Sequence, residues 1–148
     1  MKKSDYWNET LKHLMGKMAE LELALKDTQD SANSDTKSSA GDKHETSRAM
    51  AHIENERLAN QLKELQNQVE TLQKINPAIT NESINFGSLV DCESIVFFLS
   101  VGIGNIKTER SSFFAIATDS PVGKSMLGKK VGDTIKIGNN IKTIKNVE

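Results

Sequence analysis

Two stretches of the chain repeat large apolar residues at alternating spacings of four and three, and the second stretch mirrors the first. This heptad pattern lines one face of a helix with apolar side chains that pack on one partner helix. Pro77 then ends the second stretch, because proline cannot continue a helix. The first series is Trp7, Leu11, Leu14, Met18, Leu21 and Leu25; the second opens with Met50 and Ile53 and continues through Leu58, Leu62, Leu65, Val69 and Leu72.

The mirrored order favours one chain that folds back on itself over a parallel dimer of two copies. Apolar positions of the two series pair when their residue numbers sum to about 80, as for Leu21 and Leu62, so the reversal falls near residue 40. Gly41 is the only glycine in that region, and glycine suits a tight reversal. We therefore expect an antiparallel helical hairpin in a monomeric protein, a coiled-coil finger over residues 1–76 with its tip near 38–46.

Two acids, Asp42 and Glu45, follow Gly41 at the expected reversal. An Asp followed three residues later by Glu is close to a capping box, so the acids have a structural explanation as the start of the returning helix. Residues three apart on a helix are also neighbours, and two exposed carboxylates can share Mg²⁺ with a partner that supplies the other ligands. A disordered linker is the alternative, because residues 28–49 are rich in small polar residues and contain no large apolar one.

Beyond the second apolar series the pattern changes to short β-rich runs separated by turn residues. We expect a linker over 77–81 and then a small antiparallel β-sheet domain with one short helix over 82–148, so the chain belongs to the α+β class. The helix starts at Ser120 and Pro121, a preferred N-cap and a favoured first helical residue, and ends at Gly128. The expected strands are 88–92, 95–101, 113–117, 134–137 and 141–147, with turns at 102–105 and 138–140.

Composition and charge argue against several classes of function. The formal net charge of -1 lacks the basic excess of a free nucleic-acid binder. The single cysteine, Cys92, excludes an internal disulfide and a cysteine-based zinc cluster, and we expect it to be buried. All three histidines lie in the predicted hairpin, away from Cys92, so no cysteine–histidine pair is expected. We find neither a signal peptide nor an apolar run long enough for a bilayer, and we expect a cytoplasmic protein with no membrane contact and no cofactor of its own.

Three stretches together resemble the Gre-factor family. The stretch 120–133 reads Ser-Pro-Val-Gly-Lys-Ser-Met-Leu-Gly-Lys-Lys-Val-Gly-Asp and resembles the signature of the Gre-factor C-terminal domain. Residues 86–90, Phe-Gly-Ser-Leu-Val, resemble the first strand of that domain, and Gly41-Asp42-x-x-Glu45 resembles the Gre tip between two helices. The resemblance covers nearly the whole chain in architecture and implies an FKBP-like fold for the sheet domain.

Gre factors are bacterial transcript-cleavage factors, so the resemblance implies a transcription elongation factor that binds bacterial RNA polymerase and is not itself an enzyme. The sheet domain would dock at the rim of the polymerase's secondary channel, with Asp119, Ser120 and Pro121 in the docking segment. The finger would enter the channel, where Asp42 and Glu45 would be the catalytic, metal-side acids that share Mg²⁺ with the polymerase. The polymerase's own active site would then hydrolyse backtracked RNA, and contact with the nascent RNA would be indirect.

The residues around the two acids differ from the Gre tip. Where Gre factors continue with Asn-Ala-Glu-Tyr, this chain has Thr46-Ser47-Arg48-Ala49, and Lys43 and His44 lie between the acids. Two alternatives therefore stay open. One is a Gre-like regulator or inhibitor that occupies the secondary channel without stimulating cleavage, and the other is a coiled-coil adaptor protein.

Overall fold

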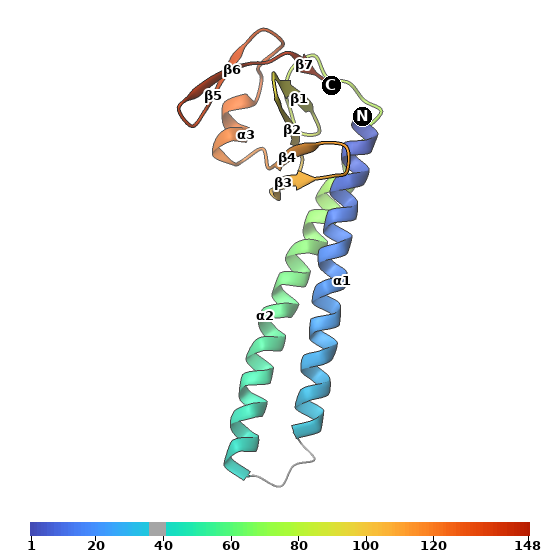
Figure 1. Cartoon of the computed structure of the whole chain (residues 1–148), viewed down its shortest axis with the longest axis vertical. Coiled ribbons are helices and arrows are strands. Elements are labelled where there is room, and N and C mark those ends of the chain that lie inside the picture. The colour runs from blue at the N-terminus through green and yellow to red at the C-terminus, as the bar shows by residue number, and fades with distance from the viewer. Residues whose placement is uncertain (36–40) are drawn as a thin grey trace. The chain divides into compact units, whose positions relative to one another are not determined.

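Two long helices form the N-terminal half of the chain and run in opposite directions, as Figure 1 shows. They are α1 (Lys3–Asp35) and α2 (Gly41–Gln73). The computed structural model describes the backbone of residues 1–35 and 41–148 and the side chains of residues 1–30 and 45–148. No helix within these residues is apolar over enough of its length to cross a membrane.

The predicted antiparallel hairpin is confirmed. The indole Nε1 of Trp7 donates a hydrogen bond to the carbonyl oxygen of Leu72 at 3.0 Å, which is one of the pairings that the mirrored series predicts. The helices include residues 28–35 and 41–49, so the alternative of a disordered linker is wrong for those residues. Of the predicted tip at 38–46, the first three residues lie outside the described part of the chain.

Toward the start of α2, the large apolar residues no longer lie on the face that packs against the other helix. Leu14 and Leu58, both in the predicted series, are only 1% and 5% exposed. Met50 and Ile53 are 67% and 65% exposed, so the prediction that they open the second apolar series is wrong. Helical geometry explains the difference, because residues three, seven and eleven positions before Leu58 share its face. Those half-buried residues are Asn55, Ala51 and Ser47.

In the described part of the chain, the C-terminal half forms a five-stranded sheet, a two-stranded ribbon and one short helix (Figure 1). The strand order of the sheet is β3-β4-β2-β1-β7, and the ribbon pairs β5 with β6. All of these pairings except β2 with β4 are antiparallel, which confirms the predicted α+β class. The elements are β1 (Leu89–Cys92), β2 (Ile95–Leu99), β3 (Gly104–Lys107), β4 (Ser112–Ile116), α3 (Pro121–Met126), β5 (Thr134–Ile137), β6 (Asn140–Thr143) and β7 (Asn146–Val147).

The parallel pair of β2 and β4 departs from the predicted all-antiparallel sheet. The predicted turn at 102–105 contains the start of β3, which forms an edge of the sheet and pairs with β4. The chain therefore reaches the edge first and returns inward, so that β4 fills the place beside β2 in the same direction as β2. Phe97 lies opposite Phe114 in this parallel pair, with ring centroids 5.7 Å apart.

The predicted last strand, 141–147, is two short strands instead of one. β6 pairs with β5, whereas β7 pairs with β1. Between them, the backbone N–H of Ile144 donates to the carbonyl oxygen of Asp133, and the N–H of Lys145 donates to that of Asp91. The chain thus passes from the ribbon to the sheet within two residues, and the fully buried side chain of Ile144 anchors the crossing.

Side chains alternate across the sheet and pack against a different layer on each face. On one face, Phe97 and Leu99 join Met126 of α3 and Ile135 of the ribbon in a buried core. On the opposite face, the ring of Phe113 meets the ring of Tyr6 from α1 edge to face, with centroids 5.0 Å apart. The sheet is therefore covered by the ribbon and α3 on one side and by the base of the hairpin on the other.

The base of each long helix belongs to the globular unit of the protein. This globular unit comprises Met1–His13 with Val69–Glu148, and the hairpin unit comprises Leu14–Gln68. Both units thus contain parts of α1 and α2. The predicted domain boundaries, which follow chain order, stay a prediction.

Lys3 links the start of α1 to the last residue of the sequence within the globular unit. Its buried ammonium donates hydrogen bonds to the carbonyl oxygens of Ile79 and Glu148, at 2.7 and 3.1 Å. Burial lowers the pKa of this ammonium, and the negative charge of Glu148 acts in the opposite direction. A hydrogen bond therefore joins Lys3, near the start of the sequence, to Glu148, its last residue.

Candidate functional site

The two predicted tip acids lie near the start of α2. The helix begins at Gly41, which places Asp42 inside its first turn, so the interpretation of Asp42 as an N-cap residue ahead of the helix is wrong. Glu45 follows one turn later and is exposed. Positions three apart on a helix lie on one face, with Cβ atoms about 5–6 Å apart. The backbone thus brings positions 42 and 45 together, although the side chain of Asp42 lies outside the described residues.

The donor set at the tip suits a hard cation but is incomplete. Carboxylate oxygens are the ligands that Mg²⁺ prefers, yet Mg²⁺ requires near-octahedral coordination. Asp42 and Glu45 supply two carboxylates, and among the described residues no three His, Cys, Asp or Glu side chains are grouped closely enough to hold a metal ion. The residues present therefore fit Mg²⁺ only if a partner supplies the remaining ligands, and their assignment as metal-side acids stays a prediction.

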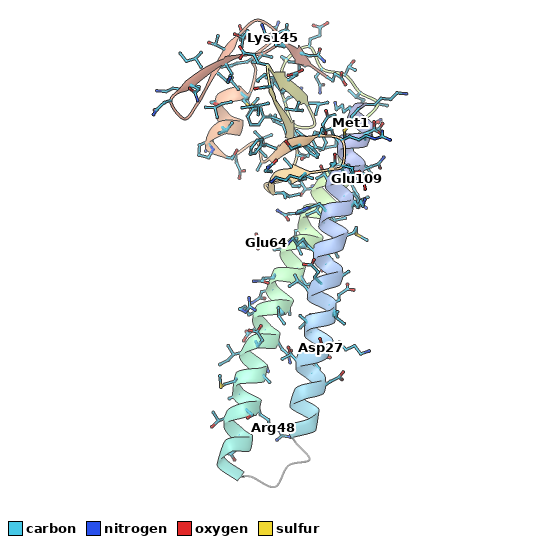
Figure 2. The ribbon with its side chains drawn as sticks, viewed as in Figure 1. Met1, Asp27, Arg48, Glu64, Glu109 and Lys145 are labelled. Carbon is cyan, nitrogen blue, oxygen red and sulfur yellow. The ribbon has the colours of Figure 1, made fainter. Side chains whose placement is uncertain are left out.

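Two arginines of the hairpin unit differ in how their charges are paired. Arg57 is held by Glu54 in a bidentate pair, with Nε–Oε2 and Nη2–Oε1 distances of 2.9 and 2.5 Å. The hydrogen bond from Arg57 lowers the pKa of the Glu54 carboxyl. Arg48, which Figure 2 labels on α2, is exposed. Within the described residues, Arg48 takes part in no salt bridge.

A groove of about 430 Å³ lies between the two helices in the middle of the hairpin unit. Leu21 of α1 and Leu65 of α2 both line it, together with charged and amide side chains from each helix. That both helices line one groove agrees with the predicted side-by-side packing of the two helices. Since the groove is open and its residues form the contact between the helices, it reflects helix packing and not a ligand site.

The predicted docking segment precedes and opens α3. Asp119 and Pro121 are exposed, which makes both available to a partner. Ser120 is the N-cap residue of α3: its Oγ accepts a hydrogen bond from the N–H of Gly123 at 3.0 Å and donates one to the carbonyl oxygen of Ala117 at 2.7 Å. The hydroxyl of Ser120 therefore has a structural role, and Asp119 and Pro121 present the accessible groups of this segment.

Gly123 is required by the close packing of α3 against the preceding loop. A Cβ atom at this position would lie 2.1 Å from the carbonyl oxygen of Ala117 and 2.9 Å from Oγ of Ser120. Both distances are shorter than any van der Waals contact, so no larger residue fits without a shift of the backbone. The Ser-Pro-x-Gly part of the sequence thus determines the local shape of the predicted docking segment.

Two apolar residues after α3 are exposed and were not identified from the sequence. Leu127 and Val131 are 42% and 57% exposed. An apolar residue beside a short helix suggests a core position, so the sequence did not predict that either side chain is exposed. Leu127 takes an extended conformation at the C-cap, with φ -53° and ψ 131°, and this ends the helix before its side chain can join the core.

Comparisons with known proteins show similarity to a curated relative and to a solved structure. No protein-family model matches the chain. The chain is 29% identical over 89 residues to the transcription elongation factor GreA of Thermotoga sp. (strain RQ2), a match that covers 59% of this chain and 57% of that protein. The chain thus spans somewhat over half the length of this relative. A solved structure of the transcription factor Gfh1 is 18% identical and covers 91% of this chain and 89% of its own, with a TM-score of 0.37.

Proposed function

We propose that this chain, whose similarity to GreA supports a GreA/GreB-like family, is a transcription elongation factor that binds bacterial RNA polymerase. Its hairpin enters the secondary channel and stimulates cleavage of backtracked RNA. The observation that carries the proposal is the placement of Asp42 and Glu45 on one face of α2, within the first two turns after the chain reverses. An acidic pair at the reversal of a helical hairpin is positioned for delivery to a recessed site.

The acidic pair acts by completing a metal site that neither protein forms alone. Two carboxylates leave most positions of an octahedral Mg²⁺ ion to other ligands, which the acids of the polymerase supply. In two-metal hydrolysis of a phosphodiester, one ion activates water and the other steadies the leaving oxygen, and the shared ion would supply one of these two roles. The chain itself contributes position and charge, so the catalytic activity belongs to the polymerase.

The proposal includes a second role, docking on the polymerase, for the segment that precedes and opens α3. Asp119 and Pro121 are exposed, whereas the hydroxyl of Ser120 is occupied in capping α3. We therefore assign recognition to Asp119 and Pro121 on an FKBP-like sheet domain. Replacing either residue by alanine should weaken binding to polymerase while the circular dichroism spectrum stays unchanged.

The test of cleavage uses backtracked elongation complexes assembled with end-labelled RNA, polymerase and Mg²⁺. The double variant Asp42→Asn, Glu45→Gln should lose stimulation of cleavage and keep its affinity for polymerase. The matched control is Asp27→Asn, Glu56→Gln, which removes the same charge from exposed positions elsewhere in the hairpin unit. Equal cleavage by the tip variant and the control would refute the metal role of the acids, and failure of the unmodified protein to bind polymerase would refute the whole proposal.

A specific observation also favours the regulator that occupies the channel without cleavage. Arg48 stands where the Gre tip has an acid, and its charge is not balanced by a salt bridge in the described residues. A positive charge beside Glu45 opposes binding of a divalent cation. The same cleavage assay separates the two functions: binding that slows nucleotide addition without releasing a cleaved RNA fragment identifies the regulator.

A further inference from the structure

Arg48 is placed to act together with Glu45 at the start of α2. The two residues are three apart on the helix, which puts them on one face, about 4.5 Å apart along the axis. Arg48 is exposed. The helical backbone on which both stand is continuous from Gly41 to Gln73, so their spacing is fixed before any partner binds.

Within the part of the chain that the structure describes, the guanidinium of Arg48 has no salt-bridge partner, whereas that of Arg57 has one. Both are exposed arginines of α2, nine positions apart in the sequence. Glu54 takes two hydrogen bonds from Arg57, at 2.9 and 2.5 Å. Among the described residues, Arg48 forms no salt bridge, even though Glu45 lies at the spacing at which helical ion pairs form. Of these two arginines of α2, the one without a salt bridge among the described residues is thus the one nearer to the reversal.

A free guanidinium is suited to one class of ligand in particular. Its planar fork presents donors that match the oxygens of a phosphate in pairs, and it stays charged at every physiological pH. Residues 42–48 contain two acids and two basic residues, so this end of α2 has no net negative charge that would repel a phosphate. Glu45 and Arg48 together therefore offer groups for a metal ion and for the phosphate that such an ion accompanies.

We propose that Arg48 binds a phosphate group at the polymerase active site. This inference rests on the proposed function, because it needs the hairpin to reach that site. The phosphate belongs either to the extruded 3′ segment of backtracked RNA or to an incoming nucleoside triphosphate, two sources that share the same chemistry. Arg48 is then a binding and positioning residue and Glu45 its metal-side neighbour.

The experiment compares Arg48→Ala, Arg48→Lys and Arg57→Ala for affinity toward polymerase in three states. The states are core enzyme without nucleic acid, backtracked complexes without nucleotide, and active-register complexes with a non-hydrolysable nucleoside triphosphate. We expect Arg48→Ala to match the unmodified protein on core enzyme and to bind about ten- to a hundredfold more weakly in one nucleic-acid state, which identifies the phosphate. Arg48→Lys should retain part of the affinity, because a lysine keeps the charge without the fork.

The control and the salt dependence make the result decisive. Arg57→Ala should bind like the unmodified protein in all three states, since its charge is already paired. The dependence of log affinity on log salt should become shallower by about 0.7 for Arg48→Ala in the affected state, the value for one phosphate contact on a single strand. Alanine is a strong helix former, so loss of α2 does not confound the result, and circular dichroism checks this.

Two results would overturn the inference, and they differ in whether the proposed function still stands. If the unmodified protein binds polymerase and Arg48→Ala equals Arg57→Ala in every state, Arg48 binds no phosphate, while the proposed function stands. If the unmodified protein does not bind polymerase in any state, both the proposed function and the role of Arg48 are wrong.

Discussion

The substitution Gly123→Ala tests whether close packing at the start of α3 determines the stability of the globular unit. The added Cβ would lie 2.1 Å from the carbonyl oxygen of Ala117. That carbonyl also accepts hydrogen bonds from the hydroxyl of Ser120 at 2.7 Å and from its backbone N–H at 3.2 Å. It cannot move away from the new atom without weakening both bonds and the N-cap that Ser120 provides.

The expected cost follows from these contacts. Two hydrogen bonds contribute about 1 kcal/mol each, and overpacking in a tight site adds about 1–3 kcal/mol. We therefore expect Gly123→Ala to lower the free energy of unfolding by about 3 kcal/mol, a large share of the roughly 5–15 kcal/mol of a typical domain. Urea unfolding followed by the fluorescence of Trp7, the single tryptophan, reports on the globular unit.

Gly16→Ala is the matched control for this experiment. Gly16 lies within α1, and an added Cβ would meet no atom within 4 Å. The substitution should stabilise the helix by about 0.5–1 kcal/mol, because alanine has the higher helix propensity. Both variants change the unfolded chain in the same way, but Gly16 lies in the hairpin unit, so helix unfolding followed by circular dichroism reports on the control. A loss of stability in Gly123→Ala alone then indicates the folded-state clash. A loss below about 0.5 kcal/mol for Gly123→Ala, within the range of neutral substitutions, would refute the packing argument.

Three further predictions concern buried polar groups. Oδ1 of Asn55 is buried and has no hydrogen-bond partner among the described residues, so Asn55→Leu should stabilise the hairpin unit by about 1 kcal/mol; slower amide exchange in α2 checks this, and faster exchange contradicts it. Burial raises the pKa of the Cys92 thiol to about 11, so native protein should resist iodoacetamide at pH 8 and react only after unfolding; rapid labelling of native protein would show that the thiol is accessible. Burial lowers the pKa of Lys3 below its ordinary 10.5, so the unfolded chain binds that proton more tightly, and the stability that Lys3 contributes should rise with pH up to about 10.5. Lys3→Met should remove this rise in urea unfolding measured between pH 8 and 10.5, and an unchanged pH dependence would exclude Lys3 as its source.

Features that depend on local spacing could be predicted from the sequence. The four-and-three repeat of large apolar residues predicted α1 and α2 and their opposite directions, which the bond from Trp7 to Leu72 confirms. Ser120 and Pro121 predicted the start of α3, where Ser120 caps the helix. The predicted turn at 138–140 is confirmed for residues 138 and 139, where Gly138 has a φ of 60°, whereas Asn140 already begins β6.

Features that depend on distant partners could not be predicted in this way. The parallel pairing of β2 with β4 follows from the position of β3 at the sheet edge, and no local pattern records which strands become neighbours. The exposure of Met50 and Ile53 follows from the angular position of Leu58 on α2, which a list of apolar residues does not resolve. At the candidate site, the Gly-Asp-x-x-Glu motif located Asp42 and Glu45. Only the contacts show that Arg57 is paired with Glu54 and that the hydroxyl of Ser120 caps α3.

The bond between Lys3 and Glu148 spans 145 positions of sequence, and this separation sets an order for folding during synthesis. The turns of α1 and α2 between Leu14 and Gln68 can form and pair as soon as both have left the ribosome, because they need no later residue. Tyr6 must wait for Phe113, and Lys3 for Glu148, so these residues of α1 are made early but reach their final contacts late. In a nascent chain arrested before residue 113, the hairpin between Leu14 and Gln68 should therefore be formed, while the parts of α1 and α2 in the globular unit are not yet packed.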